Sequence, residues 1–85
     1  MKVGIIGCGF IGSEIADFID KSEAFQLIGL NDIDKSRAYN LIKNLKNNLT
    51  KFMEVNELIK KSDLMIESAV KNSVKGILSN KNLDK

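Results

Sequence analysis

The chain has 85 residues, of which 44% are apolar and 28% are charged, with a formal net charge of +2. These values are typical of one folded domain and argue against disorder, and no apolar run is long enough to span a membrane. The single cysteine excludes an intrachain disulfide, and the lack of histidine removes the commonest general base and zinc ligand. We expect no metal site.

The N-terminus and the basic residues exclude two further classes. Residues 1–7 are too short for the apolar core of a signal peptide, so we expect a cytoplasmic protein. The basic residues are scattered among acids, and the only local cluster is Lys71, Lys75 and Lys81. We therefore expect no nucleic-acid partner.

Hydrophobic periodicity predicts strands that alternate with helices. Residues 2–6 form a nearly continuous apolar run, which is typical of a strand buried on both faces. Asp34 is a candidate N-cap for the second helix. The predicted strands cover 2–6, 25–31, 50–53 and 63–67, and the predicted helices cover 10–21, 34–47, 56–61 and 73–79. In the first helix, the predicted apolar face consists of Ile11, Ile15, Phe18 and Ile19.

This alternation predicts a three-layer α/β fold with a parallel sheet and right-handed crossovers. We expect one such domain over residues 1–85.

A glycine motif follows the first predicted strand and opens the first predicted helix. The run Gly7-Cys8-Gly9-Phe10-Ile11-Gly12 is a GxGxxG motif. The string alone also suits a tight turn without a ligand, but this setting is the one that dinucleotide binding requires. Gly7 would allow the sharp turn, Gly9 would admit a pyrophosphate, and Gly12 would let the helix pack on the strand.

An acidic residue ends the second predicted strand. Asp32 lies 20 residues after Gly12, where a carboxylate can accept hydrogen bonds from the adenosine ribose. The same carboxylate would repel a 2′-phosphate, which favours NAD over NADP, although Lys35 and Arg37 would partly offset the repulsion. The alternative is an ordinary turn or N-cap residue. For Cys8, a reactive thiol at a helix N-terminus is the less favoured interpretation, because no histidine is present as a base.

Three segments together carry a family resemblance. Residues 3–12, residues 25–32 and residues 66–69 with 73–75 resemble the N-terminal region of archaeal L-aspartate dehydrogenases. The resemblance implies a Rossmann domain that binds NAD, with NADP possible, attached in the full enzyme to a catalytic domain. This chain would supply a Rossmann-like half domain over residues 1–85, with strand order 3-2-1-4 and no catalytic domain. The fourth strand, residues 64–66, would then be an uncovered apolar edge, and we expect a second copy of the chain or another element to cover it. It also implies reversible oxidation of L-aspartate to iminoaspartate, with release of oxaloacetate and ammonia or supply of iminoaspartate to NAD biosynthesis.

The resemblance assigns residues to the cofactor but none to catalysis. The pyrophosphate would be held by Gly7, Gly9, Phe10, Ile11 and Gly12. Asp32 would hold the adenosine ribose, and Ser68 and Ala69 would lie near the nicotinamide. Val70 and Lys71 depart from the family pattern, and the family's catalytic histidine belongs to a downstream domain. We therefore expect a truncated chain that binds a dinucleotide without turning over substrate, as a homo-oligomer or without its catalytic domain.

Other interpretations stay open at this point. The chain could be the N-terminal half of another nicotinamide dehydrogenase, resembling homoserine dehydrogenase or dihydrodipicolinate reductase. It could also be a non-catalytic NAD(H)-binding regulatory module. A flavin-binding half domain is less favoured, because such proteins usually have Glu at the position of Asp32.

Overall fold

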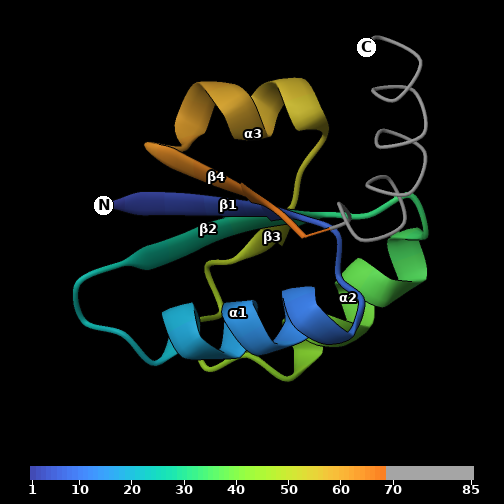
Figure 1. Ribbon diagram of the computed structural model, residues 1–85, viewed down its shortest axis with the longest axis horizontal. Helices are drawn as coiled ribbons and strands as arrows, with labels where there is room; N and C mark the ends of the chain where they lie inside the picture. Colours follow the sequence, from blue (N-terminus) through green and yellow to red (C-terminus); the bar gives the residue numbers. More distant parts are fainter. Residues whose placement is uncertain (69–85) are drawn as a thin grey trace, which may run out of the picture.

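The computed structural model describes residues 1–68, which form a parallel sheet with helices on both faces (Figure 1). The elements are β1 (Lys2–Ile6), α1 (Phe10–Asp20), β2 (Gln26–Asn31), α2 (Lys35–Lys43), β3 (Lys51–Phe52), α3 (Val55–Lys61) and β4 (Leu64–Glu67). Every predicted element in this range is present. The helix predicted at 73–79 lies outside the described residues.

The strand order in the sheet is β3-β2-β1-β4, which confirms the predicted order 3-2-1-4. All three strand pairs are parallel. In the β1–β4 pair, Ile6 lies opposite Glu67, and in the β1–β2 pair it lies opposite Asn31. The central strand β1 is therefore flanked on both sides where it runs into the glycine motif.

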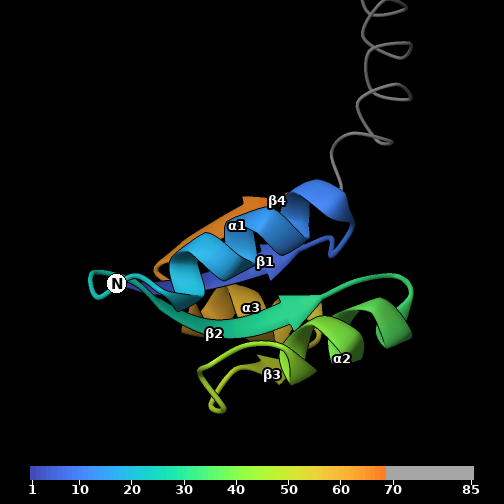
Figure 2. The same cartoon turned by 90° about the horizontal axis from the view of Figure 1, so that it is seen from below.

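The helices divide between the two faces of the sheet. In Figure 1, α3 lies on one face and α1 and α2 lie on the other, and Figure 2 shows α1 along β1 and α2 beside β2 and β3. On the α3 face, Leu58 is fully buried against Gly4 and Gly29, which are paired across β1 and β2. A Cβ at either glycine would lie within 3 Å of Leu58. These two glycines thus bring α3 close to the sheet.

The buried face of α1 differs from the predicted one. Gly12, Ala16 and Ile19 are buried, whereas Ile11 is 47% and Phe18 is 70% exposed. Small residues at two of the three buried positions allow the helix axis to approach the strands, and this rotates the larger side chains outward. The prediction that Ile11 and Phe18 belong to the core was therefore wrong.

Helix α2 is shorter than predicted. Asp34 is its N-cap, as expected, and accepts a hydrogen bond of 3.0 Å from the Ser36 amide. The helix ends at Lys43 rather than at residue 47. The carboxylate of Asp20 accepts hydrogen bonds from the amides of Lys46 and Asn47 at 2.6 and 3.0 Å. These bonds hold the chain after α2 against the end of α1, where it is no longer helical.

An apolar groove runs between α1 and the edge strand β4. Its lining is almost wholly aliphatic and aromatic and includes Val3, Ile15, Phe18, Phe25, Leu64 and Ile66. Within the described residues β4 pairs with β1 alone, and no other strand of residues 1–68 covers its outer edge. Across residues 1–68, no helix has both the length and the apolar character needed to cross a membrane.

Candidate functional site

The glycine motif forms a loop at the carboxyl ends of β1 and β2. Gly7 has φ = 99°, a left-handed conformation that L side chains rarely adopt, which confirms the expected role of a glycine in this turn. Its amide donates a hydrogen bond of 2.7 Å to the carbonyl of Asn31 at the end of β2. Its carbonyl accepts one of 2.5 Å from the hydroxyl of Ser68, the residue after β4. Both neighbours of β1 therefore hold Gly7.

The other two glycines of the motif have opposite surroundings. Gly9 is the N-cap of α1, and a Cβ added to it would meet no atom of residues 1–68 within 4 Å. At Gly12, an added Cβ would collide with the carbonyl of Gly7 and the hydroxyl of Ser68. Gly9 thus leaves space outside the backbone for a ligand, whereas Gly12 allows α1 to pack against the end of β1.

The N-terminus of α1 has the features of an anion site. Gly9 supplies no side-chain cap, and the first turn contains no acidic residue. The first amides of a helix have no intrahelical acceptor, and the helix dipole favours negative charge there. The side chains of Phe10 and Ile11, which begin this turn, are exposed. The open space at Gly9 and these free donors fit the pyrophosphate of a dinucleotide.

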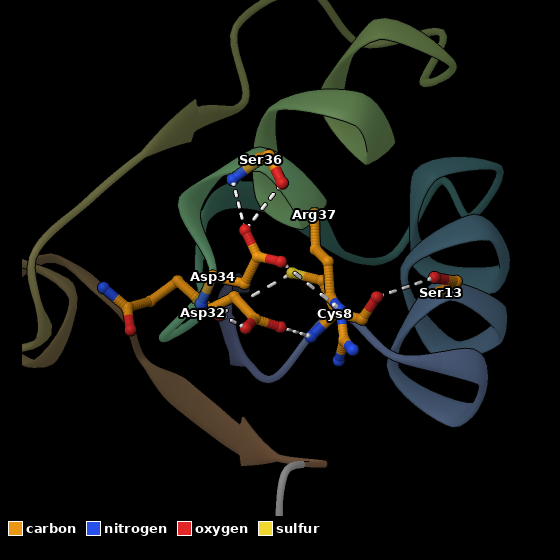
Figure 3. Close-up of polar contacts among 7 residues, drawn as sticks. Cys8, Ser13, Asp32, Asp34, Ser36 and Arg37 are labelled. Carbon is orange, nitrogen blue, oxygen red and sulfur yellow. Dashed lines mark hydrogen bonds and ion pairs between the residues drawn. The ribbon is translucent and has the colours of Figure 1, made fainter.

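Asp32 faces the glycine loop. Its Oδ2 accepts a hydrogen bond of 2.6 Å from the Cys8 amide, and its Oδ1 accepts one of 2.8 Å from the Asp34 amide (Figure 3). The N-cap of α2 is Asp34, so Asp32 is free of that role. The alternative prediction, an ordinary turn residue, accounts for the hydrogen bond at Oδ1 only. The other carboxylate oxygen, Oδ2, is bound to the glycine loop. The carboxylate is therefore placed at the rim of the cradle around Gly9.

Cys8 is a buried, protonated thiol. Its side chain is 5% exposed, and its Sγ lies 3.6 Å from the carbonyl oxygen of Asn31. Burial, followed by the nearby carboxylate of Asp32, raises the pKa of the Cys8 thiol from 9.0 to about 11. Its carbonyl accepts a hydrogen bond of 3.2 Å from the hydroxyl of Ser13. These contacts favour a structural role in the loop over nucleophilic chemistry.

The two basic residues after Asp32 differ in position. Arg37 extends from α2 toward the glycine loop and lies 3.9 Å from Asp34 (Figure 3). Lys35 instead has its ammonium group 5.4 Å from the centre of the Phe52 ring. Hydrogen bonds from Ser36 lower the pKa of the Asp34 carboxyl, which keeps that residue charged beside Arg37. Of the two predicted cations, Arg37 is thus the one directed toward the loop.

Sequence reasoning missed two residues of this site, Asn31 and Ser13. Asn31 is buried, its amide donates to the Met53 carbonyl at 2.6 Å, and its own carbonyl accepts from Gly7. A polar residue at the end of an apolar strand was the available signal. Ser13 gave no comparable signal, because a serine in the first turn of a helix is often exposed to solvent and does not indicate a contact.

The predicted site residues fall into three groups. The structure brings Gly7, Gly9, Gly12, Asp32 and Ser68 together around one loop. Phe10 and Ile11 begin α1 beside that loop. Ala69 lies outside the described residues. Within residues 1–68, no three Cys, Asp or Glu side chains gather into a potential metal site.

Comparison with known proteins agrees with this geometry. The model of the oxidoreductase family with an NAD-binding Rossmann fold matches residues 1–72. The chain is 43% identical over 79 residues to an L-aspartate dehydrogenase of Methanosarcina mazei, covering 92% of this chain and 29% of that protein. It is 35% identical over 75 residues to an L-aspartate dehydrogenase of Methanococcoides burtonii, covering 87% of this chain and 28% of that protein.

The matched region therefore covers most of this chain but only a small fraction of each relative. The chain spans less than a third of the length of the curated relatives it matches. No solved structure gives a significant match. The glycine loop, the sheet order and these similarities lead to one conclusion: the chain belongs to the oxidoreductase family with the NAD-binding Rossmann fold, as a domain that resembles part of L-aspartate dehydrogenase.

Proposed function

We propose that the loop of residues 7–12 and Asp32 form the NAD(P) site of this domain. The observation that carries the proposal is the space left open at Gly9 by the described residues, directly before the first amides of α1, which have no intrahelical acceptor. In this arrangement, Phe10, Ile11 and Gly12 offer backbone amides to the pyrophosphate. Gly7 contributes the turn that directs the chain into the helix. The carboxylate of Asp32 accepts hydrogen bonds from the adenosine ribose.

Asp32 and Arg37 have opposite effects on the choice of cofactor. The carboxylate of Asp32 repels the 2′-phosphate of NADP, whereas the guanidinium of Arg37 attracts it. Asp32 contacts the loop directly at 2.6 Å, while Arg37 is an exposed side chain whose charge is screened by water. The domain therefore prefers NAD and also accepts NADP.

The whole protein that carries this domain oxidises L-aspartate in our proposal. The relatives named L-aspartate dehydrogenase support this substrate, because their similarity extends over 92% and 87% of this chain. When bound, NAD(P) supplies the hydride acceptor for this reaction. The domain holds and orients that cofactor, and a catalytic domain or a second copy completes the site. A cytoplasmic location accompanies this function.

Titration calorimetry with NAD and NADP tests the site. We expect Asp32→Asn to weaken NAD binding by about 10- to 100-fold, the size of a hydrogen bond to a charged group. NADP binding should fall less, because the substitution also removes the repulsive charge. Asp34→Asn is the matched control: it removes the same charge two residues away and keeps a good N-cap. Equal NAD binding by wild type and Asp32→Asn would remove the ribose assignment.

A further inference from the structure

Ser68 contacts the glycine loop of the dinucleotide site through its hydroxyl. The resemblance to L-aspartate dehydrogenases places this residue near the nicotinamide, but its hydrogen bonds lie elsewhere. We propose that Ser68 is a positioning residue, whose hydroxyl holds the Gly7 carbonyl and so presets the phosphate cradle before the cofactor binds. This inference rests on the proposed function of the loop and adds a residue that acts on the cofactor through the backbone.

Hydrogen bonds hold Ser68 against the carboxyl end of β1. Its amide donates to the Ile6 carbonyl at 2.8 Å and so continues the β1–β4 ladder. Its hydroxyl lies 2.5 Å from the Gly7 carbonyl oxygen and 3.3 Å from that of Ile6. A serine hydroxyl has one proton, and the shorter contact gives that proton to Gly7.

One peptide unit is held at both of its polar atoms. The carbonyl of the Gly7–Cys8 peptide accepts from Ser68, and the amide of the same peptide donates to Asp32 at 2.6 Å. A peptide unit is planar, so two partners on opposite atoms fix its orientation. Rotation of this peptide would break both bonds and would reorient the chain that leads to Gly9. Side chains at the ends of two different strands, β2 and β4, therefore set the loop.

The same hydroxyl lies against the first turn of α1. A Cβ at Gly12 would collide with both the Ser68 hydroxyl and the Gly7 carbonyl, so these three groups are in close contact. The hydrogen bond thus also fixes how closely the N-terminus of α1 approaches the end of β1. Without the Ser68 hydroxyl, the Gly7 carbonyl would lose its partner from β4, and the loop would have more than one accessible arrangement.

Calorimetric titration of the 85-residue chain and its Ser68→Ala variant with NAD and with ADP separates the two roles. ADP contains the adenosine and the pyrophosphate but lacks the nicotinamide. Because the loop binds the shared part, we expect Ser68→Ala to weaken both ligands by the same factor, about 3- to 10-fold, as for one net hydrogen bond. A loss confined to NAD would overturn the proposal and would assign Ser68 to the nicotinamide.

Ser62→Ala is the matched control, because Ser62 precedes β4 as Ser68 follows it. The Ser62 hydroxyl is buried and has no hydrogen-bond partner among the described residues. We expect this variant to bind both ligands as wild type does. Ser68→Cys keeps the size and offers a weaker donor, so its affinities should lie between those of wild type and Ser68→Ala, and it provides the comparison if the alanine variant does not fold.

Amide NMR spectra without ligand test the loop directly. We expect Ser68→Ala to shift and broaden the amide signals of Cys8 and Gly9, while Ser62→Ala leaves them unchanged. If wild type binds neither NAD nor ADP, the proposed function fails, and these spectra still decide whether Ser68 positions the loop. Unchanged Cys8 and Gly9 signals in Ser68→Ala would contradict the positioning role.

Discussion

The loop at the carboxyl end of β1 and the groove along its flank differ sharply in polarity. At the carboxyl end of β1, the loop is held by hydrogen bonds to Asn31, Asp32 and Ser68, and the first amides of α1, which have no intrahelical acceptor, follow it. Along its flank, β4 and α1 border an apolar groove, and no other strand of residues 1–68 pairs with the outer edge of β4. Polar contacts in the first region preset a surface for a small anionic ligand, whereas the second region exposes the kind of surface that folded proteins usually cover.

Gly12→Ala should have the largest effect, because it disturbs the loop from inside. The new Cβ would collide with the Gly7 carbonyl and the Ser68 hydroxyl, so α1 must move away from the strands. We expect the free energy of unfolding to fall by about 1–3 kcal/mol, with loss of NAD binding. Urea unfolding and calorimetry measure the two effects. A variant with wild-type stability and affinity would contradict the close packing at Gly12.

Gly9→Val should separate binding from folding in the same loop. The backbone of Gly9 has φ = −75° and ψ = −159°, an extended conformation that valine can adopt, and no atom of the described part of the chain lies within 4 Å of an added Cβ. We expect the free energy of unfolding to change by less than about 0.5 kcal/mol. NAD and NADP binding should both be lost, because the side chain occupies the pyrophosphate space. Retained binding in calorimetry would move the ligand away from Gly9.

The thiol of Cys8 tests how well the loop excludes solvent. With a pKa near 11 instead of 9.0, the thiolate fraction at pH 8 is lower by about 100-fold, and burial also restricts access, so the folded chain should react more slowly with a disulfide reagent than the unfolded chain. The chain unfolded in urea is the control and should react as an ordinary thiol. Equal rates for the folded and unfolded chain would show that the loop opens freely.

The same pKa shift predicts a loss of stability in base. Between pH 9 and about 11, the unfolded chain releases the thiol proton while the folded chain retains it, so the free energy of unfolding falls as pH rises through this window. Cys8→Ala should lack this part of the pH dependence. Urea unfolding of both chains at several pH values provides the measurement.

Leu64→Lys should have the smallest effect on the fold and acts only on the open flank. Leu64 lies on β4, is 43% exposed and lines the groove. We expect the wild-type chain to self-associate through this edge and the lysine variant to sediment as a monomer, with stability changed by less than about 0.5 kcal/mol. Leu49→Lys, the same substitution at an exposed position before β3, should leave association unchanged. A wild-type chain that is monomeric at high concentration would contradict this prediction.

The sequence predicted the elements better than their faces and ends. The N-cap at Asp34 and the turn at Gly7 follow from local patterns, the strand order follows from the family resemblance, and the structure confirms all three. The exposure of Phe18 was not predictable, because helical spacing does not say which part of a broad apolar stripe meets the sheet. The early end of α2 depends on the carboxylate of Asp20, which is distant in sequence from the amides it accepts.

Local sequence by itself determined that a glycine loop joins a buried strand to a helix, since glycine spacing and apolar periodicity act over a few residues. Tertiary structure alone decided how that loop is held. Ser68 and Asp32 reach the Gly7–Cys8 peptide only because parallel pairing brings the ends of β4 and β2 to either side of β1. Hydrogen bonds require contact within about 3 Å, and residues 61 and 24 positions apart reach that distance only through the fold.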